Sequence, residues 1–295
     1  KVSEMAKKLK FPLQCIGIPK TVDNDLPYTD CSPGFGSVAK YVATSTLEAG
    51  LDVKSMAETS TKVFILEVMG RHAGWIAAAS CLAASNQGDP PHIILLPEIP
   101  FERNKFIDRV KKTVKKYGYC VIVASEGTKT KAGKFLADSG LTDAFGHKQL
   151  GGVAPVISSM ISKIGLKNHW AVADYLQRSA RHIASKTDLD QAYAVGVQAV
   201  KLAVAGKTAV MPVIKRLSDT PYKWQISTAP LKNIANIEKS VPRKFISKDG
   251  FAVTSAGRRY LNPLIQGEAP TNFKHGIPEV ALLKKSFVKK KLKKF

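Results

Sequence analysis

The sequence has few cysteines and lacks any long apolar run. Its four cysteines, Cys15, Cys31, Cys81 and Cys120, are too far apart to form a Cys-x-x-Cys pair or a dense disulfide framework. We therefore expect reduced thiols in or near the core, in preference to a metal or redox site. Because no apolar stretch approaches the roughly 20 residues that a helix needs to cross a bilayer, we expect no membrane partner.

Acidic residues are scarce as well, since 23 of them face 45 lysines and arginines and leave a formal net charge of +22. Such an excess suggests nucleic acid, a membrane surface or an anionic small substrate as the partner. Seven lysines lie between Lys284 and Lys294, a tail that we interpret as solvated, and the other charges are scattered with few aromatic residues among them. Stacking on single-stranded nucleic acid needs those aromatic residues, so nucleic acid is not an expected partner.

The first residues carry neither an initiator methionine nor a positive-then-apolar leader. We therefore expect a cytoplasmic protein. The helical pattern already begins at Lys1, from which we expect that an upstream segment precedes this chain. With 295 residues and 44% hydrophobic content, the chain can bury a substantial core in two lobes.

Strand-like and helix-like segments alternate along much of the sequence. Apolar strands are expected at residues 11–18, 63–68, 92–96, 119–124 and 170–176, with helices that begin near residues 35, 75, 104 and 156. This alternation predicts a parallel sheet with right-handed crossovers. The fold class expected is α/β, with two similar lobes of mostly parallel sheets flanked by helices.

The last third of the sequence has a different pattern. A helix is expected from Thr187 to about Ala205, opened by a capping-box-like pair of Thr187 and Asp190. Strands at 209–214 and 222–227 predict an antiparallel hairpin. We divide the chain into a donor-lobe remnant, a sugar-phosphate lobe and a return segment to the donor lobe, at residues 1–34, 35–176 and 177–295.

One polar loop combines the groups that phosphoryl transfer requires. The run from Gly17 to Asp25 (GIPKTVDND) follows an expected strand and holds two carboxylates, a hydroxyl and an ammonium group. Asp23 and Asp25 can divide the labour, because one can accept a proton while the other supports a cation beside a phosphate donor. Taken alone, such a loop is more often an Asx-rich turn.

Three further strand ends carry polar groups. Arg71 lies between two glycines in MGRHAG, where a glycine turn and a following helix can admit an anion; the neighbouring His72 is interpreted as a packing or capping residue. Glu126 precedes Gly127, and Asp174 begins the run DYLQRSA. An acid at such a position can bind sugar hydroxyls, and arginine with tyrosine can hold a phosphate, although surface and structural roles remain open.

Taken together, the ordered motifs resemble the phosphofructokinase family, and in particular its diphosphate-using branch. The resemblance rests on PKTVDND (19–25), MGRHAG (69–74), SEG (125–127) and DYLQRSA (174–180), and it continues through PGFGS (33–37) and ARHIASKTD (180–188). It covers most of the chain up to about residue 270.

This resemblance implies reversible transfer of a phosphoryl group from diphosphate to the 1-hydroxyl of fructose 6-phosphate, a glycolytic kinase reaction with Mg²⁺ as cofactor. Asp23 would be the proton acceptor, and Asp25 would lie near the metal. Thr21 and Arg71 would steady the transferring group. Lys20, a glycine in ATP-using relatives, would favour diphosphate as the donor, since it offers a compact cation to a leaving group without a nucleoside.

The resemblance also implies a substrate site and an assembly. The substrate-binding residues would be Thr21, Val22, Asp23, Lys40, Tyr41, Met69, Gly70, Arg71, Glu126, Tyr175, Leu176, Gln177 and Arg178. Among these, Lys40 and Tyr41 would reach the sugar phosphate of a neighbouring subunit, as Lys62 can in relatives. We therefore expect a homo-oligomer.

The sequence departs from the family pattern in two ways. The glycine-rich phosphate loop that the family carries upstream of PKTVDND is not found in it, and His169 stands where many relatives have an arginine. Three alternatives therefore stay open: an ATP-dependent 6-phosphofructokinase, a basic nucleic-acid-binding protein and a non-catalytic relative.

Overall fold

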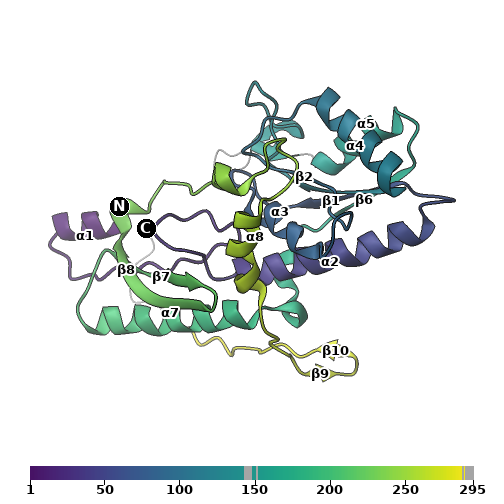
Figure 1. Cartoon of the computed structure of the whole chain (residues 1–295). Coiled ribbons are helices and arrows are strands. Elements are labelled where there is room, and N and C mark those ends of the chain that lie inside the picture. Colours follow the sequence, from purple (N-terminus) through teal and green to yellow (C-terminus); the bar gives the residue numbers. More distant parts are fainter. Residues whose placement is uncertain (143–147, 151, 288, 290–295) are drawn as a thin grey trace.

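A four-stranded parallel sheet forms one end of the molecule (Figure 1). The computed structural model describes residues 1–142, 148–150, 152–287 and 289. The strands lie in the order β2-β3-β1-β6 and comprise Val63–Val68 (β1), Ile93–Leu95 (β2), Cys120–Ser125 (β3) and Asn168–Val172 (β6). Every neighbouring pair is parallel, which confirms the parallel sheet predicted from the alternation of strands and helices.

Two layers of helices cover this sheet because its central strands are apolar on both faces. Leu66 and Val68 of β1 pack with one pair of helices, whereas Val63 and Ile65 pack with the other pair. The first pair is Phe35–Met56 (α2) and Trp75–Ala79 (α3), and the second is Arg103–Tyr117 (α4) and Val153–Ser162 (α5). Strands buried on both faces are typical of parallel sheets between helical layers.

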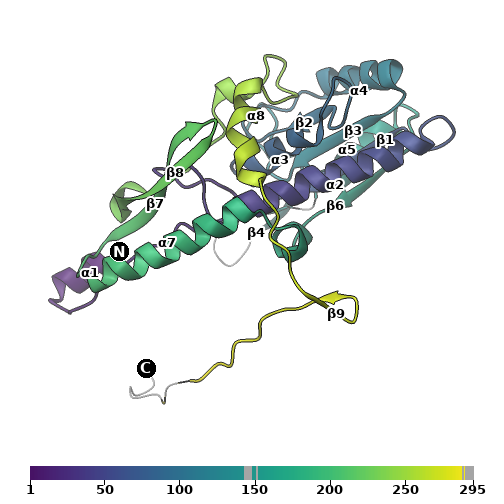
Figure 2. The same ribbon diagram turned by 60° about the horizontal axis from the view of Figure 1, so that its bottom comes forward.

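The other end of the molecule is built on an antiparallel hairpin and a long helix. Val210–Asp219 (β7) pairs with Tyr222–Pro230 (β8), as the sequence predicted, although both strands are longer. Figure 2 shows Lys186–Val204 (α7) continuing the line of α2 beneath this hairpin. Ser255–Leu261 (α8) lies between the two ends of the molecule, and Val2–Lys8 (α1) lies at the outer end (Figure 1).

The remaining elements are short. They are the strands Asp138–Thr142 (β4), Lys148–Leu150 (β5), Phe273–Lys274 (β9) and Ile277–Pro278 (β10), the helix Leu176–Ser179 (α6), and the 3₁₀ turns Ser80–Ala83, Arg181–Ile183, Leu231–Asn233, Arg243–Phe245 and Asn262–Ile265. The β9–β10 hairpin projects away from the rest of the chain (Figure 2).

The predicted strand at residues 11–18 is wrong. In this segment only Ile16 makes a strand-like contact, a parallel bridge to Val210, and the side chains of Phe11 and Leu13 are exposed. The apolar pattern indicated burial, but a strand needs partners for its backbone groups along its length. Within the described part of the chain, β7 pairs with this segment through a single bridge, which is too little to form a strand.

Two other predicted boundaries also differ. The strand expected at 170–176 begins earlier and ends at Val172, because the backbone turns into α6 and Asp174 adopts a left-handed φ of 36°. The cap of α7 is Ser185, whose hydroxyl accepts from the amide of Asp188, so the predicted Thr187–Asp190 capping pair is wrong. Thr187 instead donates to the carbonyl of Gln266 at 3.2 Å.

Asp188 joins the two ends of the molecule at the amino end of α2. Its carboxylate accepts from the amides of Gly34 at 2.8 Å and Ser37 at 3.1 Å, and from the Ser37 hydroxyl at 2.5 Å. These contacts satisfy amides that an α-helix leaves unpaired at its start. The start of α2 is therefore neutralised by a carboxylate of the chain itself.

Several simpler expectations concern the surface and the thiols. All four cysteines are free, and Cys31, Cys81 and Cys120 are buried, as predicted. No helix in the described ranges is long and apolar enough to span a membrane. Part of the lysine tail, residues 288 and 290–295, lies outside the described residues, and the division at residues 34 and 176 stays a prediction.

The turn after β3 packs directly on the turn after β1, which makes Gly127 sensitive to substitution. A Cβ at Gly127 would lie 2.1 Å from the carbonyl oxygen of Arg71 and 2.6 Å from that of Gly70. We expect Gly127→Ala to lower the free energy of unfolding by at least ~2 kcal/mol, because backbone atoms would have to move.

Gly196→Ala is the matched control, since Gly196 lies in α7 and a Cβ there meets nothing within 4 Å. We expect this change to stabilise the protein by about 0.5–1 kcal/mol through helix propensity. Urea unfolding of both variants tests the pair, and equal stabilities would contradict the close approach.

Candidate active site

The carboxyl ends of β1 and β3 bring two of the predicted motifs into contact. The amide of Glu126 donates to the carbonyl of Val68 at 2.9 Å, and the amide of Gly70 donates to the Glu126 carboxylate at 3.3 Å. Gly70 has a φ of 132°, and a Cβ there would lie 2.7 Å from the carbonyl oxygen of Ala73. The glycine is therefore required for the turn that presents Arg71.

The third motif reaches the same edge from β6. The side-chain oxygen of Gln177 accepts from the amide of Met69 at 3.4 Å, and its NH₂ group donates to the carbonyl of Asp174 at 2.9 Å. Gln177 is thus buried, and its side chain holds α6 against the end of β1. Parallel strands deliver their carboxyl ends to one edge, so the three motifs meet there.

The Asp23 loop lies close to these strand ends, because its residues Lys20 and Val22 line one groove with Gln177 and Arg178. The pKa of Asp23 is raised to about 6, chiefly by burial and further by the negative charges of Asp25 and Glu126. Arg71 and Lys20 act in the opposite direction. The loop therefore lies within electrostatic range of both the Arg71 turn and Glu126.

Local contacts shape the loop itself. The amide of Asp23 donates to the Thr21 hydroxyl at 3.2 Å, and Thr21 forms a parallel bridge to Gly34. Between the two acids, Asn24 has a left-handed φ of 55° and is fully buried. Asparagine tolerates this conformation better than most residues. The acids Asp23 and Asp25 stay partly exposed while the residue between them points inward.

A groove connects the loop with α6. It has a volume of about 520 Å³, and its lining includes Lys20, Val22, Ser37, Gln177, Arg178 and Arg181. Lys20 is exposed, so its ammonium group is available to an anion in this groove. Arg178, the other predicted basic residue in the lining, is exposed as well.

The other predicted phosphate-binding residues lie mostly at the surface. Tyr175 and Leu176 are each 63% exposed. The guanidinium group of Arg178 stacks on the Tyr175 ring at 4.3 Å from its centroid. This cation–π contact holds Arg178 in an accessible place.

The residues expected to face a neighbouring subunit make contacts within this chain. Lys40 donates to the carbonyl of Gly267 and pairs with Glu268, both at 2.9 Å, and Tyr41 packs against the main core. The Lys62 ammonium group contacts carbonyls at the end of α2. Their predicted roles at a neighbouring site stay predictions.

His169 and His72 lie at the periphery. His169 is exposed on β6, the edge strand of the sheet. His72 is exposed and faces Glu238 at 3.6 Å, and the packing or capping role expected for it stays a prediction.

The sequence reasoning missed three residues that shape the site, namely Asn24, Asp188 and Lys239. Lys239 lies more than 200 positions from residues 17–25, which we call the acid loop, yet its ammonium group donates to the carbonyls of Thr29 and Asp30 just after that loop, both at 3.0 Å. Burial lowers its pKa to about 8. Of the three, only Asn24 could have been found from the sequence. It lies inside the recognised motif, and a residue between two outward-facing acids is expected to point inward.

The donor atoms fit a magnesium ion shared with a substrate. In the described part of the chain no group of three or more His, Cys, Asp or Glu side chains is placed to hold a metal. Mg²⁺ commonly binds through one or two carboxylates and completes its shell with phosphate oxygens and water. Asp25, with Asp23 two residues away in the same loop, can supply such a partial site.

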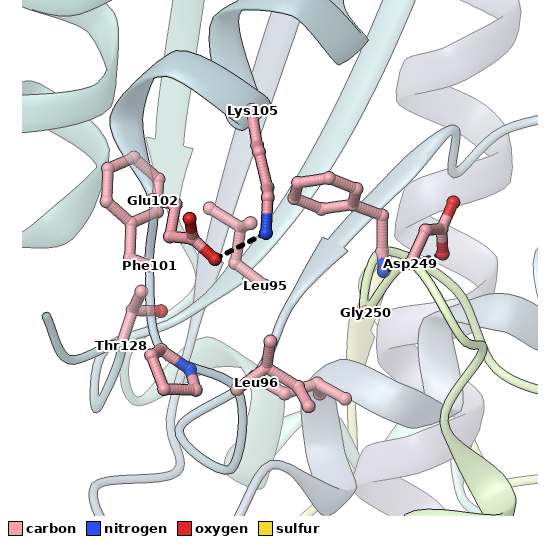
Figure 3. Close-up of a pocket in the computed structure, with 11 residues that line it drawn as sticks. Leu95, Leu96, Phe101, Glu102, Lys105, Thr128, Asp249 and Gly250 are labelled. Carbon is pink, nitrogen blue, oxygen red and sulfur yellow. Dashed lines mark hydrogen bonds and ion pairs between the residues drawn. The ribbon is translucent and has the colours of Figure 1, made fainter. Parts of the chain in front are cut away.

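A separate cavity lies beside α4 and takes no part in this site (Figure 3). Leu95, Leu96 and Phe101 give it an apolar lining, and the ion pair between Glu102 and Lys105 at 2.6 Å lies at its edge. None of the predicted site residues lines it.

The site thus combines a partly buried acid, a second acid and basic side chains at the carboxyl edge of a parallel sheet, an arrangement suited to phosphoryl transfer. Comparison with known proteins supports the same kind of reaction. The family described as Phosphofructokinase matches residues 1–203, and this chain belongs to that family.

Similar proteins support the assignment. A pyrophosphate–fructose 6-phosphate 1-phosphotransferase of Halomonas elongata is 63% identical over 296 residues, which cover all of this chain and 71% of that protein. Two crystal structures of pyrophosphate-dependent phosphofructokinases are also similar. The Nitrosospira multiformis enzyme has a TM-score of 0.92, 55% identity and coverage of 100% of this chain and 71% of its own. The Marinobacter aquaeolei enzyme has a TM-score of 0.90, 57% identity and coverage of 99% and 70%.

The raised pKa of Asp23 predicts that removing its charge makes the protein more stable but less active. Above about pH 6 Asp23 is ionised in both the folded and the unfolded state, and burial penalises the folded one. We therefore expect Asp23→Asn to raise the free energy of unfolding by about 1–3 kcal/mol at pH 8. The gain should fall as pH decreases through 6, because the folded carboxyl takes up its proton there, and vanish near pH 4.

Thermal unfolding of both proteins from pH 4 to pH 8, without divalent cations, measures this difference. The same variant should lose about 10²- to 10⁴-fold in turnover with little change in affinity for the sugar phosphate. Near-normal turnover would contradict the role of Asp23 as a base, and a pH-independent stability difference would contradict its burial penalty.

Proposed function

We propose that this phosphofructokinase transfers a phosphoryl group from diphosphate to the 1-hydroxyl of fructose 6-phosphate, reversibly, as a cytoplasmic glycolytic enzyme. The observation that carries the proposal is the meeting of the motifs at one sheet edge, where the Gly70 amide beside Arg71 binds Glu126 at 3.3 Å and the Asp23 loop shares a groove with α6. The names of the similar proteins from Halomonas elongata, Nitrosospira multiformis and Marinobacter aquaeolei support diphosphate as the donor.

Asp23 is the general base of the proposed reaction. A carboxyl group with a pKa of about 6 is ionised at neutral pH, yet it is more basic than an exposed aspartate. It can therefore take the proton of the sugar hydroxyl as the phosphoryl group arrives. Burial raises its basicity, and Arg71 and Lys20 keep it ionised.

The basic side chains around Asp23 stabilise the charge of the phosphoryl group. Arg71 offers a planar fork to the transferring oxygens, and Thr21 donates its hydroxyl to them. Mg²⁺, held at Asp25, would neutralise charge on the donor when bound. Because Lys20 lies exposed in the groove beside Val22, its ammonium group can meet the diphosphate leaving group.

The sugar phosphate binds along the strand ends in this proposal. Glu126 accepts hydrogen bonds from sugar hydroxyls, while Met69 and Gly70 line the sugar. Residues 175–178 (YLQR) hold the 6-phosphate, and the exposed Arg178, stacked on its neighbouring ring, supplies the charge.

The enzyme acts as a homo-oligomer in which Lys40 and Tyr41 of one subunit approach the sugar phosphate of the next. In this chain Lys40 pairs with Glu268, whose side chain is 83% exposed. The Lys40 side chain itself is only 14% exposed, so to reach a neighbouring phosphate it must leave both Glu268 and the carbonyl of Gly267.

Lys20 provides the test of the donor. We expect the full-length enzyme to use diphosphate far better than ATP, and Lys20→Gly to lower diphosphate-dependent turnover on the order of 10²-fold or more. A coupled assay with both donors on both proteins measures this. Efficient use of ATP with diphosphate ignored would overturn the donor assignment and leave the kinase reaction intact.

Lys163→Gly serves as the control, because Lys163 is an exposed residue at the carboxyl end of α5. It removes the same charge and adds the same flexibility away from the acid loop, so turnover should stay within about twofold. The nucleic-acid-binding alternative predicts instead an affinity for polynucleotides that falls steeply with salt and does not need Asp23.

A further inference from the structure

A buried side chain between the two carboxylates anchors the acid loop to the rest of the protein. Asn24 is fully buried, and its side-chain oxygen accepts from the amide of Ser32 at 3.1 Å and from the Lys239 ammonium group at 3.4 Å. Its NH₂ group donates to the Tyr260 hydroxyl at 3.1 Å. Any movement of Asn24 would move Asp23 with it, because the two residues are adjacent.

Lys239 contacts both the acid loop and the residues that follow it. Its ammonium group donates to the carbonyls of Thr29 and Asp30 at 3.0 Å in addition to Asn24, and its amide donates to the carbonyl of Asp25 at 2.6 Å. Three convergent acceptors suit a compact ammonium group. Their desolvation is compensated only while this cation is present.

The other side of Lys239 faces the turn that carries Arg71. Its carbonyl accepts from the Trp75 indole NH at 2.7 Å, and Trp75 is the first residue of α3, directly after that turn. Two residues further along, the amide of Val241 donates to the Glu98 carboxylate at 2.9 Å.

Glu98 completes the connection to the turn. The Glu98 oxygen that binds Val241 also accepts from the amide of Gly74 at 2.9 Å. Residues 239–241, which we call the strap, are thus bonded to the acid loop on one side and to the end of the Arg71 turn on the other.

We infer that Lys239 is a positioning residue, which through the strap fixes the acid loop relative to the Arg71 turn so that Asp23 and Arg71 meet the same phosphoryl group. The inference rests on the proposed function. Lys239 lines none of the described groove that holds Lys20, so its effect on turnover is indirect.

Two substitutions separate positioning from simple stabilisation. Lys239→Met keeps the length of the side chain and removes its three donors, and Trp75→Phe keeps an aromatic ring in the core but removes the bond to the strap. We expect kcat to fall about 10- to 100-fold in the first and about 3- to 10-fold in the second. KM for fructose 6-phosphate should stay within about threefold in both, because Glu126 and Gln177 are held by other contacts.

The double variant is informative because both changes act through one connection. Its kcat should lie within about twofold of that of Lys239→Met alone, as expected for two parts of one unit. If Lys239→Met does not fold, Trp75→Phe decides by itself.

Asp89→Ala is the control for a loss of stability. Asp89 accepts from the amides of Ser85 and Asn86 in the loop before β2, at the opposite end of the sheet. We expect it to lower the melting temperature while kcat stays within twofold.

Failure of the proposed function and failure of the positioning role of Lys239 give different results. A full-length enzyme without these substitutions that phosphorylates no fructose 6-phosphate would overturn the proposed function. An active unmodified protein, with kcat unchanged within twofold in folded Lys239→Met and Trp75→Phe, would overturn the positioning role alone. A rise in KM as large as the fall in kcat would also overturn it. So would a double variant whose loss in kcat is the product of the two single losses.

Discussion

Parallel pairing of β1 with both β3 and β6 is the constraint on which the site depends. The register sets Val68 opposite Ser125 and Glu67 opposite Val172, so all three strands leave the sheet at nearly the same level. The turns that follow them must then share a small volume. Close contact between their backbones is the result, and it leaves room for glycine alone at Gly127.

A mostly buried ion pair lies between the segment before α2 and the β7–β8 hairpin. Asp30 accepts from the Arg216 Nε at 3.0 Å, and the guanidinium group lies over the rings of Tyr222 and Tyr260. Burying such a pair costs desolvation that its attraction only partly offsets, so it contributes more to a unique geometry than to stability. The Tyr260 hydroxyl also donates to the carbonyl of Asp30 and accepts from the Asn24 side chain, which ties this pair to the acid loop.

Local patterns were sufficient to predict the sheet and the hairpin. The largely apolar run at 63–68 and the glycine turn after it indicated a strand and its end, and all residues of this strand except Phe64 are buried. The same logic failed at 11–18, because an apolar pattern does not say whether neighbouring strands are present to pair with it.

The site could be predicted only as far as its contiguous motifs extend. Asp23, Arg71 and Glu126 were found because each lies in a short recognisable run, and the structure brings their motifs together. Lys239 has no such run, and its importance comes from contacts with residues about 210 positions away. Ser185 was missed because Thr187 offered an equally good cap, and only the packed position of α7 decides between them.

The carboxylate of Asp188 at the start of α2 changes how this protein can attract anions. Helices that bind phosphate do so with free amides and a positive dipole end, and here both are already engaged by the chain's own charge. Attraction in the adjoining groove is thus left to exposed cations such as Lys20 and Arg178. Point charges of this kind are screened within about 8 Å at physiological ionic strength, so capture of a polyanionic ligand there depends on the salt of the surrounding solution.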